Sequence, residues 1–326
     1  MNQTSDKEIH NIICAVDIPS MLEKEASFIA SHPDYTISFK RYFLSSRDQK
    51  AGIGPVDGDV SFVIQPVLGE NRVAVWIFLT KDCPVKFLWH TNLCSASGDS
   101  EGQTEDILRT YEKELADAGL NISDHCVRTW FYVDDIDDNY SGVVTGRKKN
   151  FELQGMTKDT HYLASTGIGG GSVIEGTTVQ MDALAIKGAF RQHYLYAPQN
   201  FNPTHEYGVT FERGVVVEYG GESHILISGT ASINNKGEIV HPGDPLAQTL
   251  HMLKNVEALL DEAGSGWNDV RMAVVYLRNA DDYGAVSPAL KERFGTKIPY
   301  VITLAPVCRP GWLIEMECIA ATSPAE

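Results

Sequence analysis

The sequence predicts an α+β protein of two similar domains, because one helix–turn–strand unit occurs twice along the chain. The stretch QTEDILRTYEKELADAG begins at Gln103, and its counterpart QTLHMLKNVEALLDEAG begins at Gln248. Strand-like runs surround both copies. A length of 326 residues also suits two domains of about 100 to 200 residues each.

The first copy is expected to form a helix that starts near Ser100, with Gln103 completing a capping-box pattern, and ends at Gly119. The run RTWFYV follows this helix. It is rich in aromatic and β-branched residues and has the length of a strand, so we expect a buried strand here.

The second copy carries clearer end signals. Asp244 is a suitable N-cap, Pro245 suits the first helical position, and Gly264 suits the C-cap. We expect one apolar stripe along this helix, formed by Leu246, Leu250, Leu253 and Leu260 around Glu257. The run MAVVYL then predicts the matching strand.

These units predict an amino-terminal domain over residues 1–188 and a carboxy-terminal domain over 208–326. The aromatic and proline-containing segment 189–207 is interpreted as an ordered linker. Glycines in STGIGGGS, near residue 170, are expected to form a turn or bulge between strands rather than a nucleotide-binding loop.

Charge and cysteine content exclude several classes of function. The net charge is −16 with a pI near 5.0, which disfavours nucleic acid and anionic membranes as partners. The six cysteines form no CxxC pair, and the ten histidines show no metal-ligand spacing. We expect a cytoplasmic protein without a signal peptide, a membrane span or a metal cofactor. An anionic substrate would need a local cluster of arginine or lysine.

The last strand-like stretch, VCRPGWLIEMECIAA, contains two acids in an apolar setting. Glu315 and Glu317 are two residues apart and therefore point to the same face of a strand. Burial among Leu313, Ile314 and Met316 would raise the pKa of Glu315, and a neighbouring carboxylate would raise it further. Such a group can act as a general acid near neutral pH.

Motifs along the chain carry two resemblances to known protein families. The segment from about Phe211 to Ala321, with ISGTASINN, HPGD and RPGWLIEMECIA, resembles the Rid family of reactive intermediate deaminases. That resemblance implies a Rid-like fold in both domains, in which a mixed sheet has helices packed on one face, and trimer-like packing with sites in the clefts between the packed units. In Rid enzymes an arginine lies fifteen residues before the glutamate that matches Glu315, and here that position is Tyr300.

A narrower resemblance covers almost the whole chain. Together with WFYVDDI, STGIGGG and EYGVTFERG, these motifs are similar to those of chorismatases, which are tandem Rid-like proteins. The resemblance implies release of pyruvate from chorismate without a cofactor, with a dihydroxycyclohexadiene carboxylate or 3- or 4-hydroxybenzoate as the second product. It implies that Glu315 is the catalytic acid. The partner is then a small anionic substrate, and a homo-oligomer is possible.

Chorismate carries two carboxylates, so cations, hydroxyls and backbone donors are the expected ligands. The plainer reading of each residue is structural: Arg147 on a solvated face, Cys308 as a small buried group, and Tyr300 as a core aromatic. The substrate-binding candidates are Arg213, Tyr207, Arg147, Thr166, Gly229, Thr230, Ala231, Ser232, Tyr300 and Cys308.

Two other functions remain open at this point. One is a divergent enamine or imine deaminase, which the Rid-like motifs favour but the tyrosine at position 300 disfavours, because a phenol cannot clamp a carboxylate as arginine does. The other is a protein that binds aromatic acids without turning them over.

Overall fold

Residues 8–80 contribute four strands and one helix to the first sheet, and a short strand near residue 171 completes it. This computed structural model describes residues 7–322, apart from the side chain of Tyr207. The sheet has five strands in the order β1-β4-β2-β3-β8. Their bounds are β1 Glu8–Ala15, β2 Thr36–Leu44, β3 Asp59–Ile64, β4 Val73–Thr80 and β8 Gly171–Ser172, and helix α1 spans Ile18–Ala30. The short 3₁₀ helix Arg47–Gly52 follows β2.

A second, four-stranded sheet follows in the order β5-β9-β6-β7. The bounds are β5 Lys86–Cys94, β6 Cys126–Val133, β7 Ala164–Gly169 and β9 Val179–Lys187, with helices α2 Ser100–Asp117, α3 Ile122–His125 and α4 Ile136–Leu153. The glycine-rich run after β7 carries the chain back to the first sheet, where β8 pairs with β3. Residues 1–188 therefore divide their strands between two mixed sheets.

The third sheet has six strands in the order β10-β11-β12-β15-β13-β14. The bounds are β10 Arg191–Leu195, β11 Gly214–Tyr219, β12 Glu222–Ala231, β13 Val270–Leu277, β14 Tyr300–Leu304 and β15 Ile314–Thr322, with helices α5 Pro245–Glu262 and α6 Tyr283–Phe294. Three 3₁₀ helices, Thr204–Tyr207, Trp267–Asp269 and Ala280–Asp282, complete this part. Strand β10 comes from the segment interpreted as a linker.

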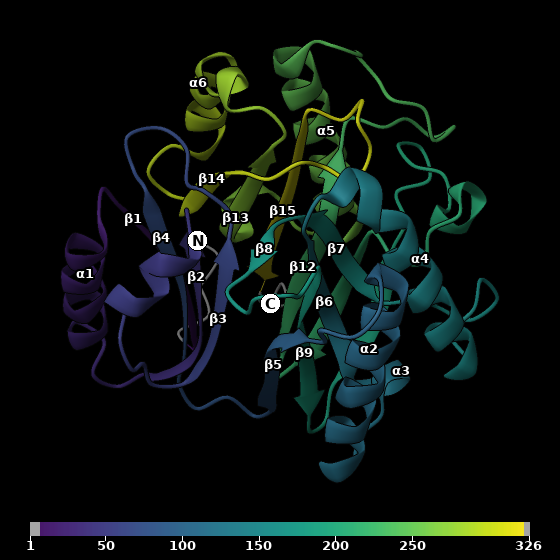
Figure 1. Cartoon of the computed structure of the whole chain (residues 1–326), viewed down its shortest axis with the longest axis horizontal. Coiled ribbons are helices and arrows are strands. Elements are labelled where there is room, and N and C mark those ends of the chain that lie inside the picture. Colours follow the sequence, from purple (N-terminus) through teal and green to yellow (C-terminus); the bar gives the residue numbers. More distant parts are fainter. Residues whose placement is uncertain (1–6, 323–326) are drawn as a thin grey trace.

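All three sheets share one plan. A parallel strand pair is joined to a central antiparallel strand: β2 and β3 beside β4, β6 and β7 beside β9, and β13 and β14 beside β15. Figure 1 shows the helices on the outside of the molecule and the three sheets facing one another in its centre. The largest hydrophobic core contains side chains from all three sheets. The predicted α+β class with mixed sheets is confirmed.

Helix α5 shows both agreement with the prediction and a difference from it. Asp244 accepts a hydrogen bond from the amide of Ala247 and caps the helix, and Pro245 is its first residue. However, Leu246 and Leu250 are exposed, because the helix buries the adjacent face. That buried face consists of Met252, Leu253, Val256, Leu259 and Leu260.

Candidate active site

A cavity lies where the second and third sheets meet. Its walls come from helix α4 and strand β7 on one side, and from β12, β15 and the segments before β11 and β15 on the other. It is therefore built by both halves of the chain. The lining residues are Tyr140, Arg147, Ser165, Thr166, Gly167, Val209, Phe211, Arg213, Gly229, Ala231, Ile233, Cys308, Arg309, Trp312 and Glu315.

Glu315 is the acidic residue of this cavity. It is the second residue of β15, opposite Ala231 on β12 and Tyr276 on β13, and is only 5% exposed. Burial raises the pKa of Glu315 to about 8, and the negative charge of Glu317 adds to the rise. The group therefore holds its proton at neutral pH, as a general acid must.

Gly229 makes room for this carboxyl. A Cβ atom at position 229 would lie 2.1 Å from Oε1 of Glu315 and 3.1 Å from Cγ2 of Thr166. Strand β12 is irregular here, since its register with β15 shifts between Ile227 and Thr230. The irregularity and the missing side chain together allow the glutamate to lie against the strand backbone.

Arginine side chains from both halves of the chain line the same cavity. Arg147 of α4 is 1% exposed, and its Nε donates to the hydroxyl of Thr210 at 3.2 Å. Its Nη2 is buried and has no hydrogen-bond partner within the described residues. An unpaired, buried N–H group is costly, so this atom is suited to a ligand oxygen.

Arg213 and Arg309 complete the positive wall. The guanidinium of Arg213 packs over the rings of Phe201 at 4.6 Å and Phe211 at 5.3 Å, and Arg309 packs over Trp312 at 5.1 Å. These rings hold the planar cations by cation–π packing, and Nη2 of Arg213 also donates to the carbonyl of Asn202 at 3.4 Å. Three arginines and one carboxyl thus line the cavity of a chain whose net charge is −16.

Cys308 lies in the same wall, where burial and the nearby Glu315 raise its pKa to about 12. The thiol is therefore protonated at neutral pH and acts as a small wall group rather than as a thiolate nucleophile. Ala231 is the other small side chain from the predicted set that lines the cavity.

Thr166 connects the cavity to the buried charges behind it. Its hydroxyl donates to Oε2 of Glu317 at 2.5 Å and accepts from the amide of Gly229 at 2.9 Å. Because that amide is already bonded, Gly229 does not supply one of the backbone donors that were expected to bind a substrate carboxylate. Glu317 also accepts from Nη2 of Arg128 and from Nε1 of Trp130, each at 2.8 Å.

Three predicted residues lie outside this cavity. Thr230 points away from the face of Gly229 and Ala231, and it donates to the carbonyl of Ser228. Ser232 donates to the carbonyl of Val240. Tyr300 lies on β14, which β13 separates from β15, and its ring packs against a ring of α6 at 4.9 Å. The side chain of Tyr207 lies outside the described part of the chain.

Several lining residues were not among the predicted ones. Tyr140 lies outside the quoted motifs, whereas Ser165 and Phe211 lie within STGIGGG and EYGVTFERG but were not selected. The fold brings all three into the wall of the cavity that holds Glu315. Arg309 and Trp312 were detectable in principle, because RPGW immediately precedes the strand that carries the acid. Arg309 and Trp312 flank Pro310-Gly311, a pair that favours a turn. This turn precedes β15, and both residues line the cavity.

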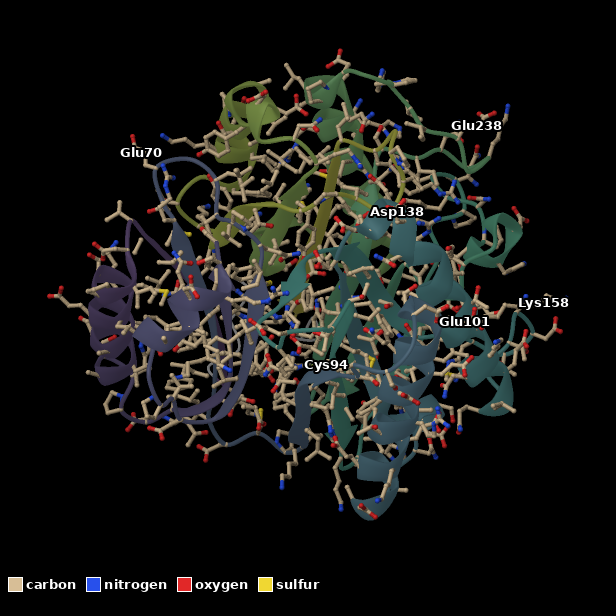
Figure 2. The ribbon with its side chains drawn as sticks, viewed as in Figure 1. Glu70, Cys94, Glu101, Asp138, Lys158 and Glu238 are labelled. Atoms are coloured by element: carbon tan, nitrogen blue, oxygen red, sulfur yellow. The ribbon has the colours of Figure 1, made fainter. Side chains whose placement is uncertain are left out.

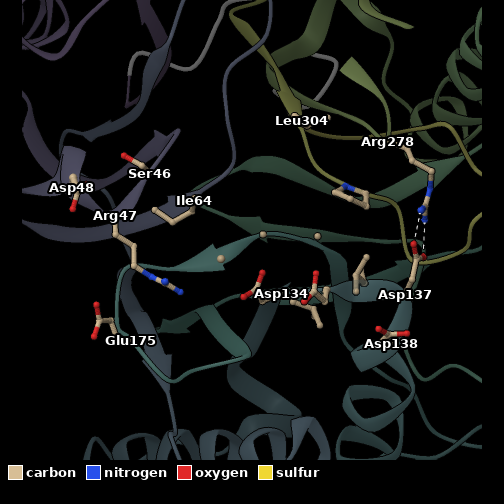
Figure 3. A pocket seen from close by; sticks show the side chains of 17 residues that line it. Ser46, Arg47, Asp48, Ile64, Asp134, Asp137, Asp138, Glu175, Arg278 and Leu304 are labelled. Atoms are coloured by element: carbon tan, nitrogen blue, oxygen red, sulfur yellow. Dashed lines mark hydrogen bonds and ion pairs between the residues drawn. The ribbon is translucent and has the colours of Figure 1, made fainter. Parts of the chain in front are cut away.

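A wider groove lies at the carboxyl ends of β6 and β7 (Figure 3). Its walls are rich in acids, including Asp134, Asp137 and Asp138. One of its two cations, Arg278, is held by Asp137 at 2.8 Å, and the other, Arg47, donates to the carbonyl of Ser172. Such a groove repels an anionic substrate, so the site for one is the smaller, arginine-lined cavity.

Two searches of the described residues 7–322 gave negative results. No group of three or more histidine, cysteine, aspartate or glutamate side chains is arranged to hold a metal ion there. None of the helices there is long and apolar enough to cross a lipid bilayer.

Comparison with known proteins gave matches to part and to all of the chain. The sequence model of the family described as Endoribonuclease L-PSP matches residues 215–322. The 3-aminoacrylate deaminase RutC of Acinetobacter baylyi is 32% identical over 98 residues, which are 29% of this chain and 77% of that protein. A RutC family protein of Pyrococcus abyssi is 37% identical over 98 residues, again 29% of this chain and 76% of the relative.

One solved structure matches almost the entire chain. The crystal structure of a chorismatase covers 97% of this chain and 98% of its own, with a TM-score of 0.70 and 18% sequence identity. At this level of identity the match establishes a shared fold.

Proposed function

Because the chain belongs to the Rid superfamily through its RutC-like carboxy-terminal part and has the fold of a chorismatase, we propose that it releases pyruvate from chorismate. One observation carries the proposal: a buried carboxyl with a pKa of about 8 shares a cavity with three arginines. Chorismate needs both features, since it has two carboxylates and an enol ether that is cleaved by acid.

Glu315 supplies the proton in this proposal. Its carboxyl transfers the proton to the methylene carbon of the enolpyruvyl group, which leaves a cationic carbon stabilised by the adjoining ether oxygen. Water adds to that carbon, and the resulting hemiketal collapses to pyruvate and the ring alcohol. A proton from the water restores Glu315, so no other acid is consumed.

The arginines hold the two carboxylates. Arg147 approaches from α4 and Arg213 from the segment before β11, so one substrate is gripped by both halves of the chain. Charge-assisted hydrogen bonds of this kind fix orientation as well as affinity. Placing the enol ether beside Glu315 makes the proton transfer effectively intramolecular, which is a major source of rate.

The direct test is to incubate the purified protein with chorismate and to couple released pyruvate to lactate dehydrogenase. The wild type is expected to turn over and Glu315→Gln is expected to lose at least about 100-fold in rate. Glu238→Gln is the matched control, since Glu238 is exposed and points outward in Figure 2. No pyruvate above the level of Glu315→Gln would refute the proposal.

Chromatography of the same reaction identifies the second product as a dihydroxycyclohexadiene carboxylate or a hydroxybenzoate. If no pyruvate forms, thermal shifts with chorismate and with 3- and 4-hydroxybenzoate would distinguish a binding protein, because a ligand that binds only the folded state raises the melting temperature.

A second candidate is enamine deamination, which the 32% identity to the deaminase RutC favours. Arg309 is a cation in the cavity that could hold the carboxylate of an aminoacrylate, whereas Tyr300 lies elsewhere. Ammonia release from 2- or 3-aminoacrylate, with no pyruvate from chorismate, would support this function instead.

A further inference from the structure

The central interface between the second and third sheets contains a clamp around Glu317. Three donors from the second sheet converge on this carboxylate: Arg128 and Trp130 of β6, and Thr166 of β7. Glu317 and Arg128 are 3% and 2% exposed. A buried carboxylate that accepts three hydrogen bonds, one from an arginine, has its position fixed and its negative charge compensated by those donors.

The direction of the hydrogen bond from Thr166 supports an ionised Glu317. The hydroxyl of Thr166 accepts from Nη2 of Arg128 at 2.6 Å and from the amide of Gly229, so its own proton points to Glu317. A protonated Glu317 would have to direct one proton at a group that is itself a donor.

Glu315 is in the opposite situation, although it is on the same face of the same strand. None of the described side chains or backbone amides donates a hydrogen bond to it. The charged and titratable groups that face it are Glu317 of β15, Tyr276 of β13, Arg128 of β6, Arg147 and Tyr140 of α4, Arg213, Cys308 and Arg309. Among these groups, only Glu317 is negatively charged.

A similar clamp surrounds Asp182 of the second sheet, but no acid there corresponds to Glu315. Strand β9 pairs with β6 as β15 pairs with β13, which places Asp182 where β15 has Glu317 and Gln180 where β15 has Glu315. Asp182 accepts from Nη2 of Arg41 at 3.0 Å and from the hydroxyl of Ser61 at 2.5 Å. Strand β5 even repeats the irregularity of β12, at residues 90–93.

This repetition distinguishes two roles of the clamped carboxylate, one in joining sheets and one in acting on a neighbouring acid. The clamp by itself joins neighbouring sheets, because the clamp around Asp182 lies between the first and second sheets without an acid equivalent to Glu315. The equivalent residue there is Gln180, which donates to the carbonyl of Phe62. At the other interface the same clamped charge lies beside Glu315. We propose that Glu317 is a positioning residue whose fixed negative charge keeps the proton on Glu315 in the empty site.

The proposal deepens the function proposed above, but its main test does not depend on turnover. The side-chain carboxyls of the full chain are labelled with ¹³C-glutamate, and the Glu315 signal is assigned by its loss in Glu315→Gln. Its titration midpoint is then measured without substrate. In the wild type it is expected near pH 8, and in Glu317→Gln it is expected to fall by at least about one pH unit.

Asp182→Asn is the matched control, because it removes the equivalent clamped charge at the interface without the acid. Its Glu315 midpoint is expected to stay within about 0.3 pH units of the wild type, well below the shift expected for a neighbouring charge. An unchanged midpoint in folded Glu317→Gln, or an equal shift in both variants, would overturn the proposal.

If Glu317→Gln does not fold because Arg128 is left unpaired, the double variant Arg128→Met/Glu317→Gln removes both charges together. The midpoint should still fall, since Glu317 acts on Glu315 more strongly than Arg128 does. Where chorismate turnover is present, the basic limb of its pH profile should move by the same amount. If the protein does not turn over chorismate, the proposed function is refuted, but the titration midpoint of Glu315 still tests the role of Glu317.

Discussion

Gly229→Ala is expected to separate activity from stability. The new methyl group would lie 2.1 Å from Oε1 of Glu315, whereas ordinary contact begins at 3.4 Å. The oxygen therefore has to retreat by about 1.3 Å. Because the displaced atom is the end of a flexible side chain, the fold can accommodate it at a cost of about 1–3 kcal/mol.

Catalysis is far more sensitive to this displacement than folding is. Misplacing a reacting group by about 1 Å costs on the order of 100-fold in rate, which is about 2.7 kcal/mol in the barrier. We expect kcat for pyruvate release to fall by at least about 100-fold while the melting temperature drops by only a few degrees.

Gly284→Ala provides the control. Gly284 lies in helix α6, and a Cβ there has no neighbour within 4 Å. Alanine should raise stability by about 0.5–1 kcal/mol and leave kcat unchanged. Wild-type kcat in Gly229→Ala, with a folded structure, would refute the placement of the Glu315 carboxyl against β12.

Three further outcomes are expected. The value of kcat/KM should be level below about pH 8 and fall about tenfold per pH unit above it, because the acid form of Glu315 is required; a profile that rises through this range would contradict a general acid. The melting temperature of Glu315→Gln should exceed that of the wild type increasingly as pH rises, because the stabilising contribution of a raised pKa is complete below about 4.5 and is lost through about 8; equal melting temperatures at pH 9 would argue against burial of this carboxyl. Arg147→Met should raise KM about ten- to 100-fold through loss of charge-assisted hydrogen bonds, whereas Lys148→Met, an exposed neighbour on the same helix, should not; equal KM values would place Arg147 outside the binding site.

Local patterns were sufficient to predict the repeated units. Caps such as Asp244, and runs such as RTWFYV and MAVVYL, depend on interactions within a few residues, and the structure has a helix and a strand at each. The exposure of Leu246 and Leu250 was not predictable in this way. The face that a helix buries is decided by the sheet beneath it, which lies far away in the sequence.

The residues of the site also fall into those that sequence patterns could select and those that only long-range packing places. Glu315 could be selected because it is an acid in an apolar strand and matches the family's glutamate, and Gly229 because it lies in the family-like motif ISGTASINN; the structure has both in one cavity. Arg147 could not be placed, because its burial depends on α4 packing across an interface between two sheets. The grouping of Tyr300 with the site was based on sequence spacing alone, and spacing does not show that β13 lies between β14 and β15.

The covalent linkage of three similar sheets has an evolutionary consequence. In an assembly of three identical subunits, every substitution is copied into all three interfaces, so none can change independently. Here each interface is encoded separately, and Gln180 can occupy the position that Glu315 occupies elsewhere. Selection can then retain an acid at one interface and mechanical cohesion at another, so the fused chain can specialise in ways that a symmetric assembly cannot.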